Sequence, residues 1–190
     1  MTVVTATHNQ GKAREMARLL KPAGIIIKSL ADCGVTEVPE ETGTTFLENA
    51  RIKARAAMEA TGLPALADDS GLCADALAGE PGVDSAVYGG LTDSAERNAY
   101  LLRQMEGKTD RRAEFVCQLV LLYPDGRELL AEGRCEGEIL DAPRGDGGFG
   151  YDPVFFVPEY NRSMAELTPE EKDAVSHRGR ALRALTETLL

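Results

Sequence analysis

The chain has 190 residues, which is enough for one compact domain with a sizeable core. Lysine and arginine number 21 and aspartate and glutamate 31, so the net charge is −10. A chain this acidic is a poor candidate for binding polymeric nucleic acid or an anionic membrane, although a small anion needs only local positive charge. No apolar run approaches the roughly 18 residues of a membrane-spanning helix, and the N-terminal segment lacks the basic start of a signal peptide. We therefore expect a cytoplasmic protein whose four separated cysteines are reduced.

Strands and helices alternate in the first half of the chain. The apolar pattern predicts, in order, a strand over 3–6, a helix over 11–20, a strand over 25–27, a polar irregular stretch over 31–43, a long helix and a strand over 63–67. The long helix is expected to begin at Thr45, because Thr45 and Glu48 form the sequence signature of a capping box and an apolar stripe follows them. The strand over 63–67 is expected to end at the turn-like segment Asp68-Asp69-Ser70-Gly71.

The second half adds a hairpin to this alternation. The pattern predicts a helix over 94–105, antiparallel strands over 115–123 and 128–139, a glycine-rich loop over 141–150, a strand over 154–157 and a helix from 176 to the C-terminus. Pro124-Asp125-Gly126 supplies the turn between the two long strands. Interleaved strands and helices with one hairpin predict a mixed α/β fold, which we expect to form a single domain over 1–190.

Two apparent nucleotide-binding motifs lack the context that they need. The run from Gly145 to Gly150 matches G-x-G-x-x-G, but a strand rather than a helix is expected after it, which argues against a dinucleotide site. Gly11-Lys12 is not a P-loop, because Ala13 stands where a serine or threonine would hold magnesium.

Acidic pairs are the strongest local signal of chemistry. Asp68 and Asp69 follow an apolar strand, and ligands of open α/β sheets bind at the carboxyl ends of strands. Adjacent carboxylates repel each other unless a cation joins them, and oxygen ligands suit magnesium. Glu40 and Glu41 form a second acidic pair in the irregular stretch. Asp-Asp-Ser-Gly is also typical of a surface turn, so these residues alone support a metal site and a turn about equally.

Two predicted helices begin with basic residues. Lys12 lies in the first turn of one, and His177 and Arg178 open the other. The positive end of a helix dipole disfavours cations unless an anion joins them, and a bound triphosphate would supply that anion. The alternative is that these side chains simply point into solvent. Similarly, Phe149-Gly150-Tyr151-Asp152 offers either an aromatic ring for a base or an ordinary core aromatic in a loop.

Taken together, these segments resemble the inosine triphosphate pyrophosphatase family, in its bacterial dITP/XTP branch. The matching segments run in order along nearly the whole chain: Ala6–Lys12, Glu40–Ala50, Lys53–Ala54, Ala67–Leu72, Gly79–Val83, Gly148–Pro153, Ala165–Leu167, Glu171–Lys172 and Ser176–Arg178. The resemblance implies an elongated α/β fold, with a mixed sheet flanked by helices and two lobes around a nucleotide cleft, and a homodimer. It also implies magnesium-dependent hydrolysis of non-canonical purine nucleoside triphosphates (ITP, dITP and XTP) to the monophosphate and pyrophosphate, which cleanses the nucleotide pool.

The functional positions of that family match residues of this chain. Asp69 matches the general base and, together with Glu40, the magnesium ligands. The matching substrate-binding positions are Thr7, His8, Asn9, Gln10, Gly11, Lys12, Ser70, Phe149, Gly150, Tyr151, Asp152, Lys172, His177 and Arg178. His8 stands where a small residue is common, and Val87 replaces an arginine of the usual pattern.

Two other functions remain open alongside this one. The first is a pyrophosphatase that acts on canonical or pyrimidine triphosphates. The second is a non-catalytic nucleotide sensor, although a sensor would not need the acidic pairs. The sequence leaves open how Asp68 and Asp69, and likewise Glu40 and Glu41, divide their roles.

Overall fold

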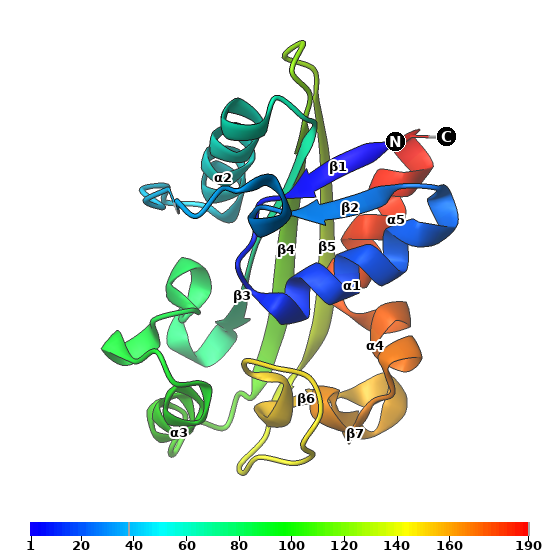
Figure 1. The fold of residues 1–190 in the computed structure, drawn as a ribbon. Coiled ribbons are helices and arrows are strands. Elements are labelled where there is room, and N and C mark those ends of the chain that lie inside the picture. Colours follow the sequence, from blue (N-terminus) through cyan, green and yellow to red (C-terminus); the bar gives the residue numbers. More distant parts are fainter. Residues whose placement is uncertain (38, 190) are drawn as a thin grey trace. The chain divides into compact units, whose positions relative to one another are not determined.

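The computed structural model describes residues 1–37 and 39–189, which form a mixed seven-stranded sheet in the order β2-β1-β3-β4-β5-β6-β7 (Figure 1). The strands are β1 (Thr2–Thr5), β2 (Ile26–Ser29), β3 (Ala65–Ala74), β4 (Arg112–Leu122), β5 (Glu128–Ile139), β6 (Phe155–Val157) and β7 (Arg162–Ser163). The helices are α1 (Gln10–Leu20), α2 (Phe46–Thr61), α3 (Ser94–Gln104), α4 (Pro169–Val175) and α5 (His177–Leu189). Single 3-10 turns connect many of these elements, among them η4 (Gly82–Asp84) and η6 (Asp152–Val154).

The sheet combines parallel and antiparallel pairs, as the sequence predicted. Strand β1 pairs parallel with β2 and with β3, so that Val4 lies opposite Lys28 on one side and Ala65 on the other. The pairs β5–β6 and β6–β7 are antiparallel. The hairpin turn is also confirmed, because the amide of Tyr123 donates to the carbonyl oxygen of Arg127 across Pro124-Asp125-Gly126.

The chain divides into two compact units, each assembled from separate stretches of sequence. Unit 1 comprises Met1–Asp69, Cys117–Gly133 and the C-terminal segment from His177, whereas unit 2 comprises Ser70–Val116 and Arg134–Ser176. None of the helices in the described ranges is long and apolar enough to cross a membrane.

Unit 1 has apolar layers on both faces of its strands. Successive residues of one strand point to opposite faces, so Val3 packs in the cluster with α1 and α5 whereas Val4 packs in the cluster with α2. Figure 1 shows α1 and α5 together on one side of these strands and α2 on the other. The start of α5 lies close against β5, because a Cβ at Gly133 would clash with the carbonyl oxygen of His177.

Helix α2 begins as its sequence signature predicts. The side chain of Thr45 accepts from the amide of Glu48, and the Glu48 carboxylate accepts from the amide of Thr45. This reciprocal pair satisfies amides that the first turn of a helix leaves without partners. Gly62 ends the helix in the left-handed conformation that glycine adopts readily.

Unit 2 has a separate core, formed where α3 and the 3-10 turns pack against their strands. The buried members include Leu72, Leu101, Phe115, Phe155 and Met164. The rings of Phe115 and Phe155 are 4.5 Å apart between centroids. Tyr151, which follows the predicted loop over 141–150, and Val175 at the end of α4 both belong to this core.

Several boundaries differ from the prediction. The most important is β3, which continues through Asp68 and Asp69 to Ala74 instead of ending in a turn after residue 67. The turn interpretation was therefore wrong, because each carboxylate of the pair finds cations on its own side of the strand. Helix α4 and strand β7 were not predicted; α4 is only seven residues long and shows no clear apolar stripe.

Candidate active site

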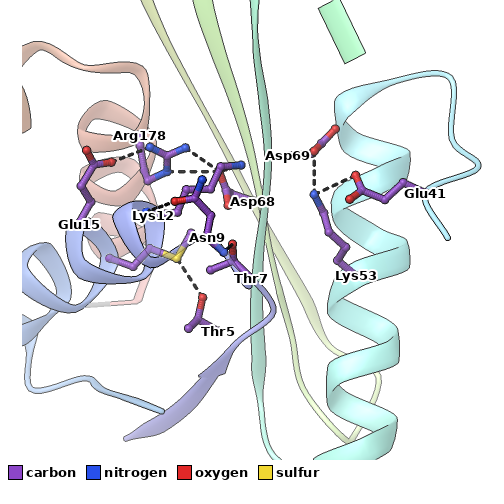
Figure 2. A network of polar contacts seen from close by, with 11 residues as sticks. Thr5, Thr7, Asn9, Lys12, Glu15, Glu41, Lys53, Asp68, Asp69 and Arg178 are labelled. Carbon is purple, nitrogen blue, oxygen red and sulfur yellow. Dashed lines mark hydrogen bonds and ion pairs between the residues drawn. The ribbon is translucent and has the colours of Figure 1, made fainter. Parts of the chain in front are cut away.

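Asp68 and Asp69 occupy successive positions of β3, and their side chains therefore point to opposite faces of the sheet. Figure 2 shows Asp68 directed toward α1 and α5, and Asp69 directed toward α2. Both residues are buried, with relative exposures of 1% and 7%. The two carboxylates thus belong to different networks and do not form the joint pair that their adjacency suggested.

The Asp68 carboxylate is surrounded by cations from two helices. The guanidinium of Arg178 on α5 donates from Nε and Nη2 to Asp68 Oδ2, at 3.2 and 2.9 Å. The ammonium of Lys12 on α1 lies 3.0 Å from the same oxygen. Arg178 also donates from Nη1 to Glu15 Oε2 at 2.6 Å. The positive charges of Arg178 and Lys12 therefore balance the negative charges of Asp68 and Glu15. Such pairing is needed because an unpaired buried charge is strongly destabilising.

Arg178 keeps its charge in this environment. Its side chain is only 2% exposed, and burial alone would lower the pKa of the guanidinium. The negative charges of Asp68 and Glu15 outweigh that effect and raise the pKa further above its ordinary value. Arg178 is consequently a permanent cation that ties α5 to β3 and to α1.

The segment predicted to bind a triphosphate caps helix α1. Asn9 is the N-cap residue, and its Oδ1 accepts from the amide of Lys12 at 3.1 Å. Thr7 Oγ1 in turn accepts from the amide of Asn9 at 3.1 Å. The first turn of α1 contains no acidic residue, so the positive end of the helix carries no carboxylate of its own. His8, Asn9 and Gln10 are exposed at this end and Gly11 is half-buried, which leaves the segment accessible to an anion.

The Asp69 carboxylate has a separate partner on α2. Lys53 Nζ donates to Asp69 Oδ1 at 2.7 Å and to Glu41 Oε2 at 3.1 Å, as the dashed lines of Figure 2 show. The second oxygen, Asp69 Oδ2, is buried and has no hydrogen-bond partner among the described residues. Burial raises the pKa of Asp69, while the positive charges of Lys53 and Lys12 oppose the rise.

The pKa of Lys53 is set by the same two effects, which act on it with opposite signs. Burial acts to lower its pKa, but the charges of Asp69, Asp68 and Glu41 and the hydrogen bond from Lys53 to Asp69 raise it above the usual value. Lys53 is therefore protonated and serves as a fixed cation beside Asp69.

The acidic residues fit a metal ion only in part. Among the described residues no group of three or more histidine, cysteine or acidic side chains is placed to hold a metal ion. Glu40 is exposed, and Glu41 rather than Glu40 joins the Lys53 pair. The buried Oδ2 of Asp69 is nevertheless an oxygen ligand that lacks a partner. Magnesium commonly binds through one or two carboxylates together with substrate phosphates, so Asp69 fits such an ion.

The predicted nucleoside-binding residues of unit 2 form a second buried network. Asp152 Oδ2 accepts from Lys172 Nζ at 2.7 Å and from the amide of Phe149 at 2.9 Å. Lys172 also lies 4.4 Å from the centre of the Phe149 ring, within range of a cation–π contact. Gly148 has φ +69°, and any Cβ there would clash with the Asp152 carboxylate. This network gathers Phe149, Asp152 and Lys172 as the sequence suggested.

The remaining predicted residues are distributed over both units. Ser70 is half-buried on β3, and Gly150 and Tyr151 belong with Phe149 and Asp152 in unit 2. His177 and Arg178 are buried at the start of α5 in unit 1. Their substrate-binding roles stay predictions.

Two residues of the networks were not assigned a role from the sequence. Lys53 lies three positions after Ala50 on the face of α2 that also contains buried Ala54 and Ala57. A lysine on such an alanine face is the signal that could have revealed it. Glu15 lies three positions after Lys12 and so shares a face of α1 with it.

Comparison with known proteins places this chain in a family. The model of the Ham1 family matches residues 3–188. The chain is 56% identical over 190 residues to a dITP/XTP pyrophosphatase of Thermus thermophilus, covering 98% of this chain and 91% of that protein. It is 52% identical to one of Lactiplantibacillus plantarum, covering 97% and 92%. A solved HAM1 protein from Coxiella burnetii superposes with a TM-score of 0.90 at 46% identity, covering 100% of this chain and 98% of that one. The chain belongs to the Ham1 family.

The Arg178 network leads to a prediction about stability. Replacing Arg178 by Met should leave Asp68 and Glu15 buried without their shared cation, which costs about 3–5 kcal/mol of unfolding free energy. Arg180→Met removes the same charge from an exposed position of the same helix and should cost less than about 1 kcal/mol. Urea unfolding of both variants and the wild-type chain measures the difference. Equal losses in the two variants would contradict the role given to Arg178.

Proposed function

We propose that this chain hydrolyses non-canonical purine nucleoside triphosphates, namely ITP, dITP and XTP, to the monophosphate and pyrophosphate. The observation that carries the proposal is the Asp69 carboxylate, with one oxygen held by Lys53 and the other buried without a partner, in the same unit as the cationic end of α1. The names of the relatives at more than half identity, dITP/XTP pyrophosphatases, support this substrate class. Removing such nucleotides cleanses the pool from which nucleic acids are made.

The triphosphate is bound at the start of α1 in this proposal. Thr7, Asn9 and Lys12 lie there, and the free amides of a helix N-terminus together with its dipole attract an anion. His8, Gln10 and Gly11 line the same turn. Lys12 Nζ is held by Asp68 at 3.0 Å, which keeps the ammonium in one place without neutralising it fully, because Arg178 shares that carboxylate.

Asp69 acts as the general base. Its buried Oδ2 accepts a proton from a water molecule, and that water attacks the α-phosphorus in line with the departing pyrophosphate. Burial raises the pKa of Asp69, which makes its carboxylate a stronger base than an ordinary aspartate. Lys53 fixes the direction of the carboxylate through Oδ1, which leaves the two lone pairs of Oδ2 for the water and for the magnesium ion.

Magnesium is the cofactor in this proposal, with Asp69 and Glu40 as its ligands. A divalent cation neutralises phosphate charge that would otherwise repel the attacking water. The chain itself supplies oxygen ligands, and Lys12 and Lys53 add fixed positive charge near them. Glu41 is already paired with Lys53, which favours Glu40 as the residue left to join the ion.

The base is recognised in this proposal by Ser70, Phe149–Asp152 and Lys172, all of which belong to unit 2. His177 and Arg178 belong to unit 1, where Arg178 donates to Asp68 and Glu15 and so fixes the carboxylate that holds Lys12. Inosine and xanthine carry a 6-keto acceptor, whereas adenine carries a 6-amino donor. Lysine can only donate hydrogen bonds, so Lys172, which lies beside the Phe149 ring, favours the keto oxygen. Adenine would leave buried donors without partners, at about 1–3 kcal/mol each.

The decisive experiment is pyrophosphate release from a panel of triphosphates. We expect ITP, dITP and XTP to be hydrolysed on the order of 10²-fold more efficiently than ATP, with GTP also poor. Equal turnover of ATP and ITP would favour a pyrophosphatase of canonical nucleotides. Binding without any release of pyrophosphate would favour a nucleotide sensor.

Asp69→Asn tests the base. The amide cannot accept the proton, so kcat for ITP should fall about 10²-fold or more while the variant stays folded. Glu59→Gln makes the same carboxylate-to-amide change at an exposed position of α2 and should retain full activity. Steady-state kinetics and circular dichroism measure both. A folded Asp69→Asn variant with nearly normal turnover would contradict the assignment.

Metal removal tests the cofactor. Activity should vanish in excess EDTA and return with added magnesium, and zinc should substitute poorly because the available ligands are oxygens. Titration of the EDTA-treated protein with each metal, followed by pyrophosphate release, measures this. Full activity in excess EDTA would exclude the magnesium requirement.

The proposal includes a cytoplasmic homodimer. Because each chain has a net charge of −10, like charges repel at the interface unless it is mainly apolar. Multi-angle light scattering should therefore give twice the mass of one chain, and the mass should change little with salt. A monomer at micromolar concentration would contradict this part of the proposal.

A further inference from the structure

The turn Phe149-Gly150-Tyr151-Asp152 is held in place from several directions within unit 2. Inside the turn, the amide of Asp152 donates to the carbonyl oxygen of Phe149 at 3.3 Å, and the amide of Phe149 donates to Asp152 Oδ2. From α4, Lys172 holds the same carboxylate. The Asp152 carboxylate thus joins the two ends of the turn, and Lys172 holds that carboxylate in place.

Tyr151 is fixed by two other contacts. Its hydroxyl donates to the carbonyl oxygen of Ser85 at 2.7 Å, and the residue is only 5% exposed. The guanidinium of Arg97 on α3 lies 6.0 Å from the centre of the ring. Ser85 itself is buried, and its hydroxyl accepts from the amide of Leu72 and donates to the carbonyl oxygen of Gly82.

Gly150 is the member of the turn with the most backbone freedom. It has φ +63°, and nothing lies within 4 Å of where a Cβ would be. Its carbonyl oxygen accepts from Nδ2 of Asn98 at 3.1 Å. No other hydrogen bond to that carbonyl is found among the described residues, so Asn98 decides the direction of the peptide that joins Gly150 to Tyr151.

Asn98 occupies an unfavourable place for its residue type. It lies inside α3, where asparagine is a poorer helix former than alanine or leucine, and it is only 5% exposed. Its Oδ1 is buried and has no hydrogen-bond partner among the described residues. Burying the side-chain amide of Asn98 with one unpaired atom lowers the stability of the fold. The hydrogen bond to Gly150 offsets part of that loss.

We propose that Asn98 is a positioning residue for substrate specificity, which acts on the base through the Phe149–Asp152 turn. This inference rests on the proposed function, in which that turn contacts the nucleoside. The direction of the Gly150–Tyr151 peptide sets whether its N–H or its C=O faces a bound base. Asn98 keeps the carbonyl turned toward α3, and so leaves the opposite face of the turn to the substrate.

Asn98→Asp tests the proposal, because it preserves the shape of the side chain and removes the donor. Gln104→Glu makes the same amide-to-carboxylate change at an exposed position of the same helix and is the matched control. We expect Asn98→Asp to raise KM for ITP about 10-fold with kcat changed less than about 3-fold. The preference for ITP over ATP should shrink, whereas the control should behave as the wild-type chain.

A ligand without a base separates positioning from general loss of structure. Tripolyphosphate should inhibit the wild-type chain and Asn98→Asp with equal Ki, because the phosphate-binding residues are in unit 1. If Asn98→Asp does not fold, Asn98→Ala removes the same donor without adding a charge and should give the same pattern. Thermal unfolding identifies which variants are folded at the assay temperature.

The outcomes distinguish this inference from the function on which it rests. A wild-type chain that releases no pyrophosphate from ITP overturns the proposed function itself. An active wild-type chain, with KM and the ITP-to-ATP preference unchanged in both folded variants, overturns only the role of Asn98. Equal weakening of ITP and tripolyphosphate would also overturn it, because that result indicates general damage to the fold.

Discussion

The buried ion pair between Arg178 and Asp68 is the interaction on which unit 1 depends. Arg178 is the largest fully buried side chain of the described protein, and it carries a charge. A charge in that position persists only when carboxylates surround it, so α5, β3 and α1 must meet at this point. The same carboxylate holds Lys12, and thus the arrangement that stabilises the unit also fixes a cation at the start of α1. Stability and the proposed phosphate site therefore share one set of contacts.

The alternation of side chains along β3 gives the adjacent aspartates different environments. Asp68 faces two cations and is largely neutralised, whereas Asp69 faces Lys53 and retains a buried oxygen without a partner. The proposed base and a structural counter-ion can therefore be neighbours in the chain without repelling each other strongly. Had the segment formed a turn, both carboxylates would have shared one environment, and their roles could not have been separated in this way.

Buried lysine–carboxylate pairs recur in both units of this acidic chain. Lys53 pairs with Asp69 in unit 1 and Lys172 with Asp152 in unit 2, and the lysine side chains are only 12% and 8% exposed. An overall charge of −10 would repel a triphosphate, so the positive charge must be concentrated and shielded from solvent to act on one. Each pair also orients its carboxylate, which a solvated surface pair would not do.

The sequence by itself determined the local elements and the family. The capping box of Thr45 and Glu48 depends only on residues close in the chain, and so does the turn at Pro124-Asp125-Gly126. Both could therefore be predicted from the sequence. It also led to the predicted site residues, because their segments resemble a known family in order, and their roles stay predictions. Only the tertiary structure decided the division between Asp68 and Asp69, the choice of Glu41 as partner of Lys53, and the contact of Asn98 with Gly150. These contacts join residues far apart in the chain, and local propensity holds no information on which distant cation or carbonyl a side chain will meet.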